Sequence, residues 1–142
     1  MLHHTGLLVM LMIAVAPLAP GGGVSVKRLV GLRYPPIATQ AQIQGDVKVF
    51  CKIGADGKVE GTEAVSGHPI LAKAARENAS QWLFEVPAGN PPQEWTFALT
   101  HRFRLEGECE APSCTSTFVF EYPDSITVLS PAPHWNPSQA PE

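Results

Sequence analysis

The feature that most constrains the fold is the eleven-residue run Trp95–Leu105, in which apolar and polar side chains alternate. Successive side chains of a β-strand point to opposite faces, so a period of two predicts a strand with one buried face. A sheet that is covered on one face leaves backbone edges open. An open edge can recruit an extended peptide through main-chain hydrogen bonds.

Two further strands and a helix are predicted before this run. Val47–Ile53 also alternates, the loop Gly54–Gly57 follows it, and Val59–Val65 reads as a second, less regular strand. Pro69 suits the first position of a helix, which the apolar spacing continues to Trp82. We therefore predict an α+β domain, with a small antiparallel sheet of three to five strands and one main covering helix. Its core should contain Trp82, Leu71, Ala75, Val47, Val49, Phe97, Leu99 and Phe103.

The chain of 142 residues is long enough for one domain, which we place at residues 24–129. Residues 1–23 carry the apolar run Leu7–Ala19, which is shorter than the ~20 residues of a membrane-spanning helix. This run predicts a secretory signal peptide, and a short uncleaved signal anchor is the alternative. Residues 130–142 contain four prolines and are expected to form a loose tail.

Charge is distributed unevenly along the sequence. The formal net charge is −3, which argues against nucleic-acid binding. All ten Lys and Arg lie within Lys27–Arg104, whereas six acidic residues and no basic ones follow Arg104. The acidic C-terminal part is either a solvated tail or a segment that lies against the basic part.

Several short motifs in this order resemble the C-terminal domain of the TonB family. They are Tyr34-Pro35, Gly45-Asp46-Val47-Lys48-Val49, Asp56-Gly57-Lys58-Val59, Ser66-Gly67-His68-Pro69-Ile70-Leu71, Ala74-Ala75 and Trp82-Leu83-Phe84-Glu85. The resemblance covers roughly half of the chain. Each motif alone is a weak signal, and their order and spacing make the resemblance specific.

The resemblance implies a periplasmic, non-enzymatic domain that grips a peptide and serves transport across the envelope. Its partners would be a protein or peptide, such as an outer-membrane receptor, and an inner-membrane motor complex, and a homodimer is left open. If the N-terminal run is not cleaved, the domain would instead be anchored to the inner membrane. The implied peptide-binding edge consists of Thr96, Ala98, Thr100, Arg102, Tyr34 and Pro35.

The sequence also departs from the family pattern. Only the fourteen residues 20–33 separate the apolar run from Tyr34, and the family's long proline-rich spacer is missing there. Fourteen residues extend at most about 50 Å. An uncleaved anchor would hold the domain near the inner membrane, so the alternative is a structural or regulatory envelope protein without motor or receptor coupling.

The three cysteines suit an oxidising compartment. Cys109 and Cys114 flank a short loop that contains Pro112, so we predict a disulfide between them. Two free thiols or a metal pair is the competing interpretation, and no second pair of metal ligands lies nearby. Cys51 falls on the apolar side of its strand and should be a buried free thiol.

A strongly alternating segment, Thr115–Tyr122, follows the cysteine loop, and a short strand is expected at Ile126–Leu129. Sequential strands with a short connection usually pair antiparallel. We therefore predict that Thr115–Tyr122 lies beside Trp95–Leu105 and occupies the edge that a receptor peptide would use. The alternative is that Thr115–Leu129 packs elsewhere or exchanges between two chains.

The histidines do not indicate an active site. His101 lies on the apolar face of its strand, where a hydrogen-bonded structural role is expected, and His68 fits the turn before the helix. Ser66 near His68 lacks a third orienting group and an oxyanion loop. No phosphate-binding or dinucleotide motif occurs in the sequence. We therefore expect no enzymatic activity, no metal and no cofactor.

Overall fold

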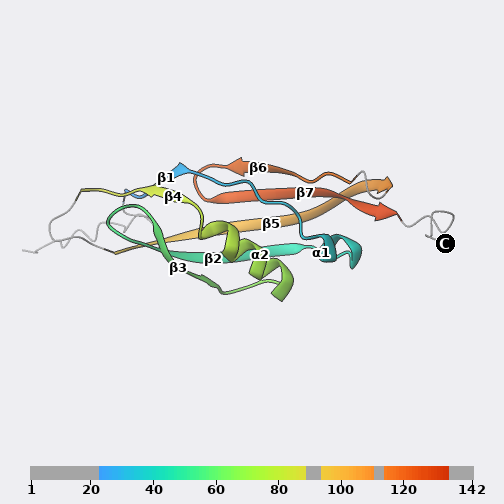
Figure 1. The fold of residues 1–142 in the computed structure, drawn as a ribbon, viewed down its shortest axis with the longest axis horizontal. Helices are drawn as coiled ribbons and strands as arrows, with labels where there is room; N and C mark the ends of the chain where they lie inside the picture. The colour runs from blue at the N-terminus through green and yellow to red at the C-terminus, as the bar shows by residue number, and fades with distance from the viewer. Residues whose placement is uncertain (1–22, 89–93, 111–113, 135–142) are drawn as a thin grey trace, which may run out of the picture.

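The computed structural model describes residues 23–88, 94–110 and 114–134. Within them lie two helices and seven strands (Figure 1): β1 Ser25–Arg28, α1 Pro36–Gln40, β2 Gly45–Ile53, β3 Val59–Ala64, α2 Pro69–Ala79, β4 Leu83–Glu85, β5 Trp95–Glu110, β6 Thr117–Glu121 and β7 Ser125–His134. Neither helix is long and apolar enough to cross a membrane. The predicted signal segment lies outside the described residues.

Five strands form one sheet in the order β3-β2-β5-β7-β6, and β1 pairs with β4 in a separate two-stranded sheet. The α+β character is confirmed, but the prediction of an antiparallel sheet is wrong. Strand β7 runs parallel to β5, while the other neighbouring pairs are antiparallel. After β5 the chain forms β6 at the outer edge of the sheet. It then turns back as β7, which lies between β5 and β6 (Figure 1).

The pairing of β2 with β5 organises the core. Their register places Val47 opposite His101 and Val49 opposite Leu99, so the odd-numbered side chains of both strands point to one face of the sheet. The turn that joins β2 to β3 requires a glycine at position 57, where φ is +80°. A Cβ atom there would also collide with the carbonyl oxygen of Phe84, whose N–H donates to the Gly57 carbonyl at 2.8 Å.

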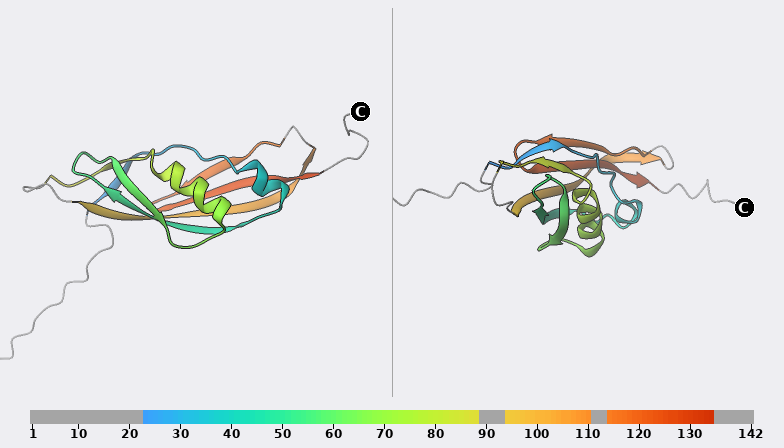
Figure 2. Two further views of the ribbon diagram at one scale, coloured as in Figure 1. Left: turned by 60° about the horizontal axis from the view of Figure 1, so that its bottom comes forward. Right: turned by 60° about the vertical axis from the view of Figure 1, so that its left-hand side comes forward.

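Helix α2 covers one face of the five-stranded sheet (Figure 2). Pro69 occupies its first turn, and the side chain of His68 caps it by accepting a hydrogen bond from the N–H of Ile70 at 3.3 Å. Leu71, Ala75 and Ala79 are fully buried beneath it. All eight predicted core residues are buried, and the core also contains Tyr34, Phe84, Ile126 and Val128. We call the opposite side of the sheet the open face.

The region after Leu105 departs most from the predictions. Strand β5 continues to Glu110, and β7 runs to His134, so Ser130–His134 belongs to the sheet and not to a loose tail. The strand beside β5 is β7, and β6 lies one position further out. The identity of the added strand was therefore wrong, although an added strand does lie beside β5. Burial gives the physical reason, because Ile126 and Val128 of β7 are almost completely buried.

Candidate functional site: the edge of strand β5

Two hydrogen bonds fix which way the backbone of β5 faces. The N–H of Thr100 donates to the carbonyl of Asp124 at 2.9 Å, on the β7 side. The N–H of Leu105 donates to the side chain of Gln44 at 2.8 Å, on the β2 side. Backbone groups alternate along a strand, so over Trp95–Leu105 the even-numbered residues face β7 and the odd-numbered residues face β2.

Strand β7 closes only part of this edge. Its pairing with β5 begins at Thr100 and runs to Glu110, with a register shift between Leu105 and Glu108. Among the described residues, no strand pairs with Trp95–Leu99 on that side. The N–H and C=O groups of Thr96 and Ala98 face the unpaired side. We call Trp95–Leu99 the unpaired stretch of β5.

The structure brings four of the six predicted site residues together. Thr96, Ala98, Thr100 and Arg102 alternate with core residues along β5, so their side chains lie on the open face. Thr96 and Ala98 fall in the unpaired stretch. The backbones of Thr100 and Arg102 are already paired with β7.

The other two predicted residues lie elsewhere. Tyr34 is buried on the core side, with its ring edge against Phe103 at 5.3 Å between centroids. Its hydroxyl donates to the carbonyl of Ile43 at 2.6 Å. Pro35 is the residue that precedes helix α1. Phe103 lies seven residues from Thr96, about 23 Å along an extended strand, so Tyr34 is not part of the unpaired stretch.

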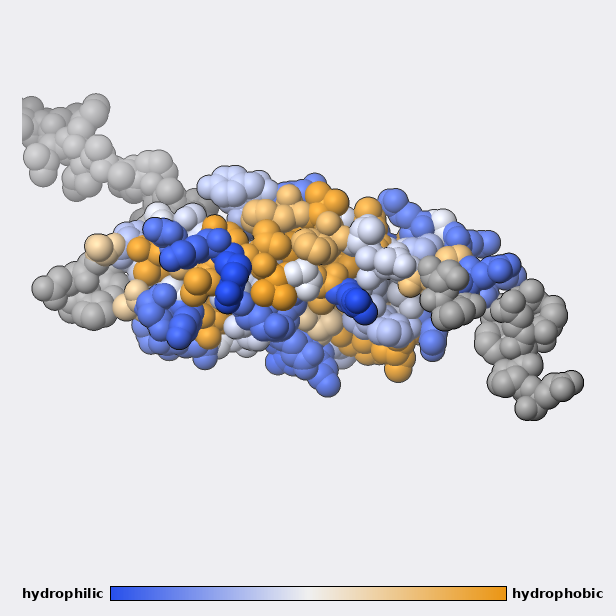
Figure 3. All heavy atoms as spheres, turned by 45° about the horizontal axis from the view of Figure 1, so that its top comes forward, coloured by the Kyte–Doolittle hydropathy of each residue, from blue (hydrophilic) through white to orange (hydrophobic). Residues whose placement is uncertain are grey.

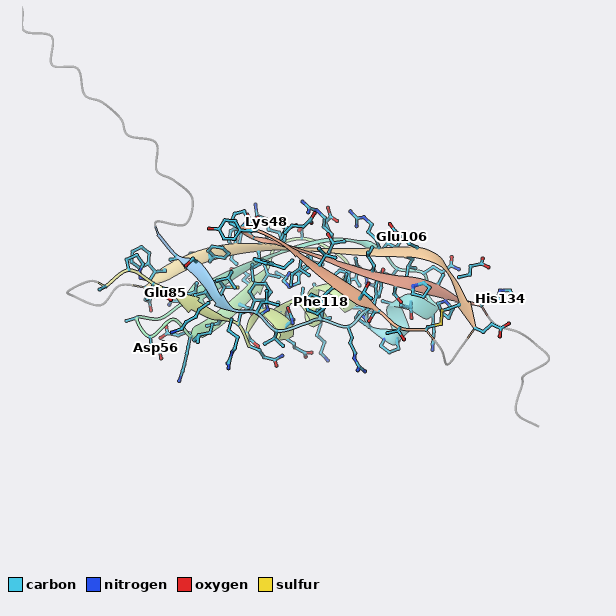
Figure 4. All side chains as sticks on the ribbon, turned by 90° about the horizontal axis from the view of Figure 1, so that it is seen from above. Lys48, Asp56, Glu85, Glu106, Phe118 and His134 are labelled. Carbon is cyan, nitrogen blue, oxygen red and sulfur yellow. A yellow bond between two sulfur atoms is a disulfide. The ribbon has the colours of Figure 1, made fainter. Side chains whose placement is uncertain are left out.

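Charges on the open face are largely paired. Lys52 approaches Glu94 at 3.1 Å, Arg102 approaches Glu121 at 3.0 Å, and Arg104 approaches Asp46 at 2.6 Å. Lys48 lies over the ring of Phe50, 5.7 Å from its centroid. Figure 4 shows Lys48 and Phe118 on opposite sides of the strands β5 and β7. Three of these four cations therefore have a carboxylate partner on the open face.

A buried polar network lies on the core side of β5, at His101. The amide oxygen of Asn78 accepts from the indole N–H of Trp82 at 3.1 Å and contacts Nε2 of His101 at 3.3 Å. The amide nitrogen of Asn78 donates to the carbonyls of Val30 and Gly31. The structural role predicted for His101 is confirmed, and burial lowers its pKa to about 4. Sequence reasoning missed Asn78, whose only signal was its position four residues before Trp82.

Cysteine chemistry follows the predictions. Cys109 and Cys114 form a disulfide with 5.5 Å between their Cα atoms, which joins the end of β5 to the residues before β6. Cys51 is a buried free thiol, and burial raises its pKa to about 12. Near neutral pH this thiol is therefore protonated, and the protonated form is not nucleophilic.

The side chains that could suggest catalysis have structural partners. The hydroxyl of Ser66 accepts from the N–H of Lys48 at 3.1 Å, and Nδ1 of His68 accepts from the N–H of Ile70. Within the part of the chain that the structure describes, no cluster of His, Cys, Asp or Glu could hold a metal ion. The candidate functional site among the described residues is therefore the backbone edge of β5.

Comparison with known proteins identifies one family. The family model described as "Gram-negative bacterial TonB protein C-terminal" matches residues 30–105. A solution NMR structure of the Pseudomonas aeruginosa TonB C-terminal domain aligns over 58% of this chain and 87% of that chain, with 23% identity and a TM-score of 0.46. No curated protein matches. The family match ends at Leu105, so Glu106 and all of β6 and β7 lie beyond it.

Proposed function

The chain belongs to the family of TonB C-terminal domains, and from this premise we propose that it is a periplasmic protein-binding domain that serves transport across the cell envelope. Its partner would contribute an extended segment that adds to the unpaired stretch of β5. We further propose that the domain is not an enzyme. In this role the domain would bind an outer-membrane receptor and be coupled to an inner-membrane motor complex.

One observation carries the proposed site: β7 stops short of the first five residues of β5, Trp95–Leu99. The main-chain groups of Thr96 and Ala98 have no strand partner on that side among the described residues. Strand addition uses such groups, because main-chain hydrogen bonds supply affinity without requiring a particular sequence. Tyr122, 78% exposed in the turn beside Thr100, offers an aromatic contact at the end of the unpaired stretch.

The closure of the edge from Thr100 onward favours a second candidate function. A domain whose recognition edge is shortened to five residues holds a receptor peptide less firmly than one with the full strand free. The chain would then be a structural or regulatory envelope protein that keeps the fold without motor or receptor coupling. The two functions differ in whether a partner segment reaches Thr96 and Ala98.

Site-specific photocrosslinking in living cells distinguishes them. A benzophenone side chain at Thr96 should give an adduct with a second envelope protein, and mass spectrometry should locate the crosslink in an extended segment of that protein. The same group at Glu106, an exposed residue of the same strand, is the matched control and should give none. Ala98→Pro, which removes an outward N–H, should reduce the Thr96 adduct at least tenfold. Equal adducts at both positions, or none, would reject this site and leave the second function.

A further inference from the structure

The outermost strand of the sheet, β6, has an unpaired edge of its own. It pairs with β7 on one side, and no described strand lies on the other. Phe118 is 41% exposed and Val119 52% exposed, which is unusual for large apolar side chains on neighbouring strand positions. Figure 3 shows apolar side chains gathered on the side of the molecule that carries β6.

This edge lacks the usual protection against strand pairing. Edge strands commonly carry lysine, proline or a bulge that prevents association with another chain. Strand β6 reads Thr-Phe-Val-Phe-Glu and contains none of these. Its single charge, Glu121, is bound by Arg102 at 3.0 Å and by the hydroxyl of Thr127 at 2.9 Å. The edge is thus free of unpaired charge.

The hydrogen-bonding direction of β6 follows from that of β5. Because Asp124 accepts from Thr100, the even residues of β7 face β5 and its odd residues, Ser125, Thr127 and Leu129, face β6. Their partners Glu121, Val119 and Thr117 therefore bond inward. Phe118 and Phe120 direct their N–H and C=O groups outward, to the free edge.

We propose that a second copy of this chain occupies the edge, with the two β6 strands antiparallel about a two-fold axis at Val119. In this register Phe118 of one copy lies opposite Phe120 of the other, and these are the residues whose backbone groups face outward. All outward groups of both phenylalanines then find partners. The two sheets join into one continuous sheet, and the interface is isologous.

The side chains also match in this register. The sequence Phe-Val-Phe reads the same in both directions, so each aromatic ring meets another aromatic ring on the core face. Val119 meets Val119 on the open face. Glu121 lies opposite Thr117, so no like charges face each other. A partner peptide of other sequence would need to reproduce this pattern, whereas a second copy supplies it automatically.

The inference is independent of the proposed function, because β6 and the unpaired stretch of β5 are different strands. Val119→Cys in the full chain, expressed in a Gram-negative periplasm, tests it directly. The two Val119 Cα atoms would be about 4.5 Å apart as a non-hydrogen-bonded pair, which permits a disulfide. We expect a reducible dimer on a non-reducing gel.

Thr117→Cys is the matched control, since Thr117 is exposed on the same strand and the same face. In the proposed register it lies about 13 Å from its own copy, four residues at ~3.3 Å each, too far for a disulfide. A dimer from Val119→Cys with little from Thr117→Cys supports the register. Equal crosslinking of both variants, or none, would overturn it.

A second measurement does not rely on engineered cysteines. Sedimentation velocity of the purified full chain in mild detergent should show a dimer that Val119→Lys weakens at least tenfold, because two lysines would face each other across the axis. Val65→Lys is the control, since Val65 is 50% exposed but lies outside β6. A parent that stays monomeric, or equal effects of the two lysines, would contradict the proposal.

Discussion

Two stretches of strand β5, Trp95–Leu99 and Thr100–Phe103, share one neighbour, β2, and differ in the other. From Thr100 to Phe103 β5 lies between β2 and β7, and its backbone is paired on both sides. From Arg104 onward β7 is its one strand neighbour among the described residues. Over Trp95–Leu99 only β2 is paired with it. The same strand is thus a central strand over Thr100–Phe103 and an edge strand over Trp95–Leu99, and only an edge can accept a partner by strand addition.

This difference shows how a binding edge can be shortened without changing the domain that carries it. The residues that match the family, 30–105, include all of β2, α2 and the first eleven residues of β5. Strand β7 comes from beyond that match and contributes Ile126 and Val128 to the same core. A strand whose side chains complete the core is not displaced readily by a peptide.

The largest expected effect tests whether β7 is part of the core. Ile126→Ala should lower the free energy of unfolding by about 3 kcal/mol, as truncations of buried isoleucine do. Urea denaturation monitored by tryptophan fluorescence measures the change. Val65→Ala is the control, because Val65 is 50% exposed and lies outside the strands of the sheet, and it should change the free energy of unfolding by less than about 0.5 kcal/mol. If both variants unfold like the parent, β6 and β7 are an appendage and the edge of β5 is open along its length.

The pH dependence of stability tests the part of β5 that lies between β2 and β7, because His101 is buried there. Its pKa is about 4 in the folded chain, against 6.5 for an unperturbed histidine, so the unfolded chain takes up the proton first as pH falls. The burial of neutral His101 therefore makes the free energy of unfolding depend on pH. Its contribution is fully present above pH ~6.5 and is lost as pH falls from ~6.5 to ~4. About 2 kcal/mol of it is lost between pH 7 and pH 5.

His101→Gln isolates this contribution, because glutamine does not titrate. The parent should lose about 2 kcal/mol more than His101→Gln when urea denaturation at pH 7 is compared with pH 5. Carboxylates and the remaining histidines affect both proteins equally and cancel. Identical losses in the two proteins would mean that His101 is accessible to protons in the folded state, which is incompatible with a closed core beneath β5.

The disulfide fixes the connection from β5 to the added strands. Cys109→Ser with Cys114→Ser should lower the free energy of unfolding by about 2 kcal/mol, since the bridge closes a short loop. Thiol titration of the unfolded, non-reduced parent should give one free thiol per chain, from Cys51. Three free thiols in protein isolated from the periplasm would show that the Cys109–Cys114 bridge does not form.

Periodicity predicted the part of the fold that local sequence determines. Alternation located β2 and β5, helical spacing located α2, and together they identified eight core residues. Alternation does not specify which strand is the neighbour of which. Thr115–Tyr122 has the stronger pattern, yet Ser125–His134 takes the central position because its alternate side chains fit the core. Long-range packing decided this order.

The candidate site was predicted in part for the same reason. Thr96, Ala98, Thr100 and Arg102 share a face because they alternate along one strand, which sequence alone reveals. The limit at Thr100 depends on where β7 begins, and the sequence does not encode that register locally. Tyr34 and Pro35 are distant from the unpaired stretch because Tyr34 packs against Phe103, a contact between residues 69 positions apart.

Amide hydrogen exchange along β5, resolved by residue in the full chain, tests most directly whether β7 divides this strand. The amides of Thr100, Arg102 and Arg104 face β7 and should exchange slowly, at rates set by global unfolding. The amides of Thr96 and Ala98 face the unpaired side and should exchange at least a hundredfold faster. Slow exchange at all five amides would mean that the whole edge is paired. Fast exchange at Thr100, Arg102 and Arg104 would contradict the closure of β5 by β7.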